Sequence, residues 1–147
     1  MLSLDYGSKR IGVAICDELE ITAYGIATIV SKNRKQVLEA LSELIRQYSV
    51  EKIVIGYPVR LDGTIGIQCE KVDRFSKILE DAFALPVVKW DETLTTKEAE
   101  EILLQANVRR KKKKNLVDQI AATLILKGYL ASLETKKKPL QPEQFLS

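Results

Sequence analysis

Hydrophobic and polar positions alternate at the start of the chain, which is the pattern of a strand with one buried face. The apolar positions are Leu2, Leu4 and Tyr6, and between them fall Ser3, Asp5 and Gly7. Aspartate has a low strand propensity and is rarely buried, so an Asp in mid-strand needs a partner. Asp5 therefore either binds a partner such as a metal ion or faces solvent at a strand end.

Strand patterns continue through a Gly7-Ser8 turn into residues 10–15 and then 21–30, which predicts an antiparallel meander. Apolar residues then recur at helical spacing, and these helices alternate with short apolar runs typical of strands buried on both faces. The expected elements after the meander are a helix capped by Ser31 or Asn33 with apolar positions 37–48, a strand at 52–56, a turn and cap at 61–64, a helix with apolar positions 72–83, a strand at 86–90, a helix capped by Thr95 or Thr96, and a last helix from about Asn115 to Leu133.

This order predicts an α/β fold with one five-stranded mixed sheet, a three-strand antiparallel meander plus two parallel strands, flanked by helices. We expect one domain over residues 1–134 and a basic, flexible C-terminal tail over 135–147. No run of about 18 apolar residues and no signal-peptide pattern is found, so we expect a cytoplasmic protein without membrane contact. Cys16 and Cys69 are then expected to be reduced core residues.

Histidine is absent from the sequence. Ser-His and Cys-His nucleophile pairs, histidine general bases and histidine-ligated zinc sites are therefore excluded. The polar chemistry of an enzyme with this composition has to come from carboxylates, Lys or Arg, hydroxyls, or a metal held by oxygen ligands.

Basic residues are concentrated in two runs, although the net charge is only +3. Arg109 to Lys114 is an unbroken run of six, and Lys136 to Lys138 adds three more. Without these nine, 14 of the 23 Lys and Arg residues remain, which is fewer than the 20 acidic residues. An acidic body with basic appendages predicts binding of a polyanion at particular places, although a charge run is also common in solvated loops.

Carboxylates at two further places predict a shared site with Asp5. Asp91 and Glu92 end the last predicted strand, at the carboxyl edge where open α/β sheets bind ligands. Asp118 lies in the first turn of the last predicted helix, on the face that also carries Ala121-Ala122 and is expected to pack on the sheet. A carboxylate on that face is costly unless it is paired or binds a metal. The alternative is that Asp118 caps the helix or forms a salt bridge at its start.

Three carboxylate positions far apart in sequence, Asp5, Asp91/Glu92 and Asp118, thus predict one metal site. Oxygen ligands favour Mg²⁺ or Mn²⁺, and two such ions about 4 Å apart activate water and stabilise the leaving oxygen in phosphodiester hydrolysis. Basic residues beside the carboxylates would neutralise the phosphates of a nucleic acid. The expected nucleic-acid-binding residues are Lys9, Arg10, Arg109, Arg110, Lys111, Lys112, Lys113 and Lys114.

Four segments, in the same order along the chain as in a known family, carry a resemblance that covers nearly the whole chain. They are Leu4–Ala14, Val54–Pro58 with Leu61–Thr64, Trp90–Thr96 with Ala99-Glu100, and Val117–Ala122. These segments resemble the bacterial YqgF family, also called RuvX. The resemblance implies an RNase H-like fold, a cytoplasmic location, and either resolution of Holliday junctions, by similarity to RuvC, or maturation of the 5′ end of pre-16S rRNA.

The resemblance also implies roles for the carboxylates. Asp5, Asp91, Glu92 and Asp118 would be catalytic, with Asp5, Glu92 and Asp118 assigned as the metal ligands and Asp91 as the alternative to Glu92. One departure is Thr93, which stands where the family usually has Arg. A second is the strand end Gly56-Tyr57-Pro58, which lacks the acid that RuvC-like enzymes carry there.

The function that these features favour is a metal-dependent endonuclease for structured nucleic acid, with pre-16S rRNA preferred over branched DNA. Ribosomal precursor particles are possible partners, and junction cleavage would call for a homodimer. One alternative is a phosphotransferase or ATPase, because the Asp-x-Gly hairpin resembles the phosphate loop of the actin and sugar-kinase superfamily. That superfamily needs a second domain, and 147 residues do not hold two. The other alternative is a nucleic-acid-binding factor without catalysis.

Overall fold

The computed structural model describes residues 1–17, 22–58, 66–91, 101–102 and 110–137, and within the last range it gives the backbone alone for 110–115 and 134–137. The strands are β1 (Leu2–Tyr6), β2 (Arg10–Cys16), β3 (Ala23–Val30), β4 (Ile53–Tyr57) and β5 (Val87–Asp91). The helices are α1 (Arg34–Gln47), α2 (Ile67–Phe83) and α4 (Arg110–Lys137). The predicted helix beginning near Thr95 lies mostly outside the described residues.

The five strands form one mixed sheet in the order β3-β2-β1-β4-β5. β2 pairs antiparallel with both β1 and β3, and β4 pairs parallel with β1 and with β5. The predicted sheet, a meander followed by two parallel strands, is therefore confirmed. β1 occupies the centre, so Asp5 lies in the middle strand of the sheet.

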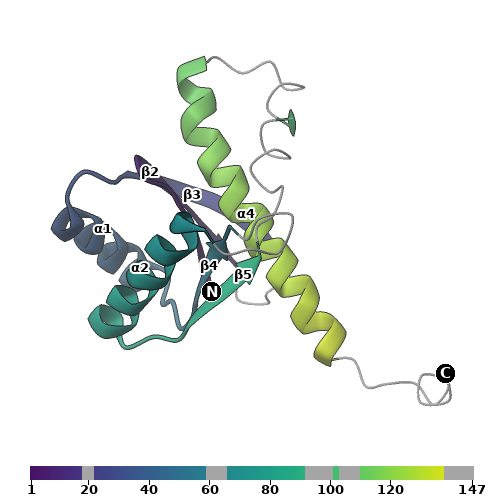
Figure 1. Cartoon of the computed structure of the whole chain (residues 1–147). Coiled ribbons are helices and arrows are strands. Elements are labelled where there is room, and N and C mark those ends of the chain that lie inside the picture. The colour runs from purple at the N-terminus through teal and green to yellow at the C-terminus, as the bar shows by residue number, and fades with distance from the viewer. Residues whose placement is uncertain (18–21, 59–65, 92–100, 103–109, 138–147) are drawn as a thin grey trace, which may run out of the picture.

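Helices cover the sheet on both faces (Figure 1). α1 and α2 lie on one face, while α4 crosses the other face and extends past the sheet at both ends (Figure 1). The core under α1 and α2 is the larger one and includes Leu2, Leu4, Val37, Leu41, Val72 and Leu79. The core under α4 includes Val54, Ile125, Leu126, Tyr129 and Leu130. Alternate residues of each strand therefore point either to the core under α1 and α2 or to the side covered by α4.

The face of the last helix that was predicted to pack on the sheet is confirmed. Ala121 and Ala122 are fully buried, and their small side chains bring the helix close to the strands. The buried Ser3 hydroxyl donates a hydrogen bond of 2.7 Å to the Ala122 carbonyl oxygen. This bond joins residues 119 positions apart and shows that Ser3 lies on the α4 face.

Replacing Ser3 with Ala is expected to lower the free energy of unfolding by about 1 kcal/mol, because it removes a buried hydrogen bond between β1 and α4. Urea denaturation would measure the change. Ser42→Ala on the exposed side of α1 is the control and is expected to have little effect. Equal stability of the two variants would mean that the Ser3 bond contributes nothing net.

Several element boundaries differ from those predicted. α1 has Asn33 as its N-cap, as one of the two predicted options, but Tyr48 is its exposed C-cap rather than part of its buried face. α2 begins after Gly66, which makes no side-chain cap bond, so the cap expected at 61–64 is wrong. β5 is an edge strand with a half-buried pattern, not a strand buried on both faces, because it pairs only with β4 among the described residues.

The last helix is longer than predicted, since it begins at Arg110 rather than near Asn115 and ends at Lys137. Lys and Arg are good helix formers, so the basic run continues the helix instead of preceding it. Asp118 is therefore about two turns from the first helical residue, and its predicted place in the first turn is wrong. The domain boundary at residue 134 stays a prediction, although the helix continues three residues past it.

Cys16 and Cys69 are both buried free thiols, as expected.

Within α4, the stretch Leu116–Leu133 is long and apolar enough to cross a membrane by composition alone, with a mean hydropathy of 1.3. No such stretch was expected from the sequence. In this fold the stretch packs on the sheet, and packing of that kind accounts for its apolar composition.

Candidate active site

Asp5 and Asp118 come together where α4 crosses the centre of the sheet. Asp5 is two residues from Ser3 on β1, so both point to the α4 face. Its cross-strand neighbour on β2 is Gly12. A Cβ atom at Gly12 would lie 1.9 Å from the Asp118 carbonyl oxygen and 2.9 Å from the Asp118 Cβ. The helix thus rests on the bare backbone of Gly12, and this contact brings Asp118 beside Asp5.

Asp118 also forms an ion pair with Arg10. The Arg10 Nε donates to Asp118 Oδ2 at 2.8 Å, and the two side chains are 31% and 16% exposed. Arg10 is two residues from Gly12 on β2 and so shares its face. Of the two interpretations of Asp118 drawn from the sequence, the salt bridge is present in the structure, although not at a helix start.

Asp91 and Glu92 were predicted to supply one more acid. Asp91 ends β5 opposite Tyr57 and is exposed. Trp90 packs in the α4 core and contacts the Tyr129 ring edge-on at 5.8 Å between centroids. Because side chains alternate along a strand, Asp91 belongs to the opposite face, where Lys89 also lies. Glu92 lies outside the described residues.

Within the described ranges, no group of three or more acidic or cysteine side chains could hold a metal ion. Asp5 and Asp118 together offer carboxylate oxygens, which suit a hard divalent cation such as Mg²⁺, because Mg²⁺ is commonly held by one or two carboxylates while waters and substrate phosphates complete its coordination. The predicted third ligand, Glu92, belongs to the part of the chain that is not described.

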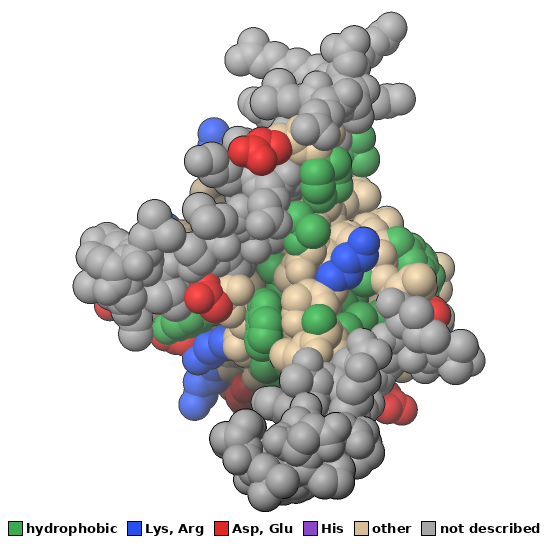
Figure 2. Space-filling model, turned by 90° about the vertical axis from the view of Figure 1, so that its right-hand side faces the viewer, with side chains coloured by type: hydrophobic (Ala, Val, Ile, Leu, Met, Phe, Trp, Pro, Cys, Tyr) green, Lys and Arg blue, Asp and Glu red, His purple; other side chains and the backbone are tan. Residues whose placement is uncertain are grey.

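The predicted nucleic-acid contacts are only partly described. Lys9 is exposed in the hairpin that precedes Arg10. Arg110 to Lys114 form the first residues of α4, and Arg109 lies outside the described residues. On the face in Figure 2, the described basic and acidic side chains are scattered among hydrophobic ones rather than gathered in one charged patch. The role of the basic run stays a prediction.

A second polar cluster, missed by the sequence analysis, lies on the α2 face near the carboxyl ends of β4 and β5. The Tyr57 hydroxyl donates to Asp73 at 3.2 Å, and Lys89 forms an ion pair with Asp73. Burial and the neighbouring Asp73 raise the pKa of Tyr57 to about 12, while the Lys89 ammonium lowers the pKa of Asp73. The feature of the sequence that could have indicated this cluster is Lys89, a charged residue within the apolar run of β5. This cluster joins the two parallel strands to α2.

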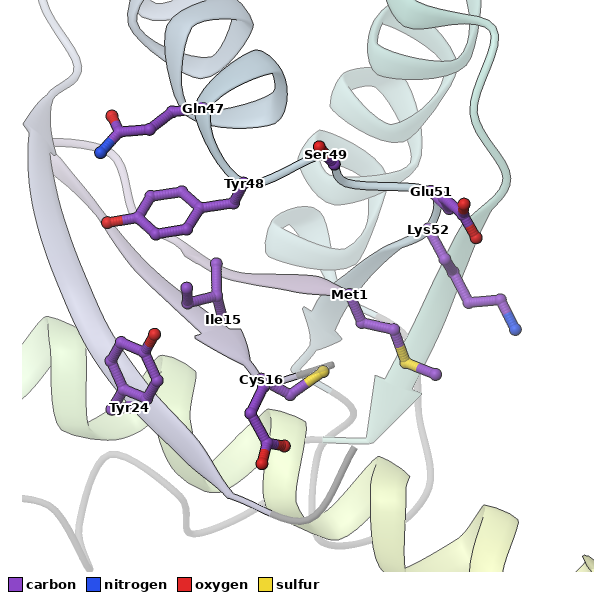
Figure 3. A pocket seen from close by; sticks show the side chains of 10 residues that line it. Met1, Ile15, Cys16, Tyr24, Gln47, Tyr48, Ser49, Glu51 and Lys52 are labelled. Carbon is purple, nitrogen blue, oxygen red and sulfur yellow. The ribbon is translucent and has the colours of Figure 1, made fainter. Parts of the chain in front are cut away.

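A pocket of about 710 Å³ opens at the other end of the strands. Figure 3 shows Tyr24 from β3 and Tyr48 at the end of α1 on its walls, with Met1, Cys16 and Lys52 around them. Met1 directly precedes β1 and is four residues from Asp5, which corresponds to about 13 Å along an extended chain. The pocket is therefore separate from the Asp5–Asp118 pair.

Solved structures of Holliday junction resolvases share this fold. T. thermophilus RuvC in complex with Holliday junction substrate matches with a TM-score of 0.54 and 14% identity, over 95% of this chain and 100% of that chain. The fowlpox virus resolvase in complex with Holliday junction DNA matches with a TM-score of 0.53 and 14% identity, over 90% and 99% of the two chains. At this identity the likeness defines the fold class, which is RNase H-like, as the resemblance implied.

Sequence comparison identifies the family within that class. The model of a family described as "RuvX: Holliday junction resolvase" matches residues 1–132, so the chain belongs to the RuvX family. A protein of Syntrophus aciditrophicus named "Putative pre-16S rRNA nuclease" is 55% identical over 139 residues, covering 95% of this chain and 93% of that protein. A protein of Bacillus subtilis with the same name is 47% identical over 135 residues, covering 90% and 98%.

Proposed function

We propose that this protein is a metal-dependent endonuclease that hydrolyses phosphodiester bonds in structured nucleic acid, with the 5′ end of pre-16S rRNA as its substrate. The observation that carries the proposal is the contact of Asp118 with Gly12, the cross-strand neighbour of Asp5. This contact brings the carboxylates of Asp5 and Asp118, which are far apart in the sequence, to the same face of the sheet. The names of the relatives that are 55% and 47% identical supply the substrate.

The residues present fit a divalent cation in their chemistry. Asp5 and Asp118 supply hard oxygen donors, and we propose Glu92 as the third ligand and Mg²⁺ or Mn²⁺ as the cation, with two ions per site. When bound, the ions would lower the pKa of a water molecule and stabilise charge on the leaving oxygen. The positions of Asp5 and Asp118 are fixed relative to each other, because β1 is the central strand and the Ser3 hydrogen bond joins α4 to it.

The choice of Glu92 over Asp91 follows from strand alternation. Asp91 shares the α2 face with Lys89, whereas the next residue of a continued strand would point to the α4 face with Asp5. Glu92→Gln is therefore expected to reduce Mn²⁺-dependent cleavage about a hundredfold or more, and Asp91→Asn only a few-fold. Initial cleavage rates of the two purified variants would measure both effects. Each variant is the control for the other, because the two substitutions remove the same charge at neighbouring positions. The reverse order of effects would contradict the assignment.

The substrate class is tested directly by a panel of nucleic acids. Purified protein with Mn²⁺ is incubated with a pre-16S rRNA fragment, a four-way DNA junction and single-stranded RNA. Cleavage of the rRNA fragment at its mature 5′ end, lost on addition of EDTA, is the expected result. Absence of cleavage together with salt-sensitive binding would instead indicate a binding factor without catalysis.

A second candidate function is resolution of Holliday junctions, because the description of the matching family names it. Junction cleavage needs paired incisions, so we propose a homodimer for this activity only. Preferential cleavage of the four-way junction in the panel, by a species of dimer mass in light scattering, would favour it. A cytoplasmic location and association with ribosomal precursor particles belong to the rRNA proposal.

A further inference from the structure

Arg10 is the cation that holds Asp118 in the described part of the chain. Its contact is made by Nε alone, at 2.8 Å from one carboxylate oxygen. A guanidinium carries five N–H donors in a planar fork, so this single contact leaves the four N–H groups of the two Nη atoms outside the ion pair.

The base of the Arg10 side chain is fixed by the hairpin before it. The Gly7 N–H donates to the Arg10 carbonyl oxygen at 3.0 Å, and a Cβ at Gly7 would lie only 2.6 Å from that oxygen. The Ser31 N–H donates to Lys9 on the other side at 2.9 Å. The backbone at Arg10 is therefore held from both neighbouring segments, while the long side chain, 31% exposed, still reaches solvent.

The pair is part-buried, with Asp118 only 16% exposed, so this carboxylate needs a countercharge, and Arg10 supplies it. A cation beside the carboxylates has two other effects. It competes with a metal ion for the Asp118 oxygens, and its remaining donors match the oxygens of a phosphate group. Both effects act at the place where the proposed function puts metal and substrate together.

We propose that Arg10 is an exchangeable counter-ion and a phosphate-positioning residue. In the metal-free protein its guanidinium neutralises Asp118, and when a divalent cation takes the carboxylate, Arg10 is released to hold a non-bridging phosphate oxygen of the substrate. The inference rests on the proposed function and adds a residue that orders the two binding events.

The test measures Mn²⁺ binding and nucleic-acid binding separately from cleavage, with Arg10→Gln as the main variant. Without nucleic acid, Arg10→Gln is expected to bind Mn²⁺ about fivefold more tightly, because a competing charge near the carboxylate is gone. With Ca²⁺ in place of Mn²⁺, its affinity for a pre-16S rRNA fragment is expected to fall about tenfold. Isothermal titration calorimetry and fluorescence anisotropy would provide the two readouts.

A matched control exists on the opposite side of the molecule. Arg46 pairs with Glu43 at 2.7 Å on α1, with side chains 76% and 69% exposed, so Arg46→Gln makes the same charge change in another ion pair. It is expected to leave both affinities within about twofold of wild type. Arg10→Lys keeps the charge and is expected to restore Mn²⁺ affinity to the wild-type level, while phosphate binding recovers only in part.

Opposite shifts of the two affinities are the signature of the exchange, which a merely structural salt bridge would not produce. Equal or weaker Mn²⁺ binding by Arg10→Gln would overturn the competition, and unchanged rRNA affinity would overturn the phosphate contact. Wild-type protein that binds no Mn²⁺ would overturn the proposed function together with the exchange. Wild-type protein that binds Mn²⁺ and cleaves, beside an Arg10→Gln variant with unchanged affinities, would overturn the exchange alone.

Discussion

Asp5→Asn is expected to lower Mn²⁺-dependent cleavage of a pre-16S rRNA fragment by about a hundredfold or more, without unfolding the protein. The physical reason is that an amide keeps the size of the carboxylate but loses its charge, and the charge is what binds the cation. Asp5 lies in the central strand, so its backbone bonds to β2 are unaffected by the change. Initial cleavage rates and a urea denaturation curve would be measured on the same preparation.

The control for charge loss alone is Asp81→Asn on the exposed side of α2. It removes the same charge far from the site and is expected to leave the cleavage rate unchanged. Cleavage retained by Asp5→Asn at the wild-type rate would contradict the carboxylate mechanism. Loss of cleavage accompanied by an unfolded protein would show that Asp5 acts on stability, and binding of Mn²⁺ by the folded fraction would then separate the two roles.

Gly12→Ala is expected to lower both stability and activity, and its effect on stability is expected to be the largest of the substitutions described. Its Cβ would lie 1.9 Å from the Asp118 carbonyl oxygen, which is backbone and cannot rotate away as a side chain can. The helix has to move off the sheet by more than an ångström, and overpacking of this kind costs about 1–3 kcal/mol or more. The same shift separates Asp118 from Asp5, so cleavage is expected to fall with stability.

Gly25→Ala is the matched control for the Gly12 variant. A Cβ at Gly25 would lie 2.7 Å from the Gln119 Cβ, one residue along the same helix but above β3. We expect a smaller loss of stability there and a smaller loss of cleavage, because β3 is further from Asp5 than β2 is. If Gly12→Ala were as stable and as active as wild type, the close approach of α4 to β2 would not be required for the site.

Position 5 shows how far local sequence patterns reach. The alternation around Asp5 predicted a strand, and it also predicted that Asp5 and Ser3 share one face. The helical spacing around Asp118 likewise predicted that it shares a face with Ala121-Ala122, which are buried on the sheet. Both results depend only on residues a few positions apart, since strand and helix periodicity are local properties of the backbone.

The helix start at Arg110 shows where such patterns fail. The run of like charges indicated a solvated segment before the helix, but high helix propensity continued the helix through it, and Asp118 lost its expected place in the first turn. The edge position of β5 could not be read from its apolar composition either. Strand order depends on which distant strands pair, and composition reports only how apolar each strand is.

The sequence by itself determined the order of strands and helices, the absence of histidine chemistry, the carboxylates available and, through its motifs, the RuvX family. Only the tertiary structure decided that Gly12 is the point where α4 meets β2, that Arg10 neutralises Asp118, and that Asp91 faces away from Asp5. The physical reason is one of range. Periodicity fixes the direction of a side chain within its own element, but the neighbour across a sheet or under a helix is set by packing between segments about 100 residues apart.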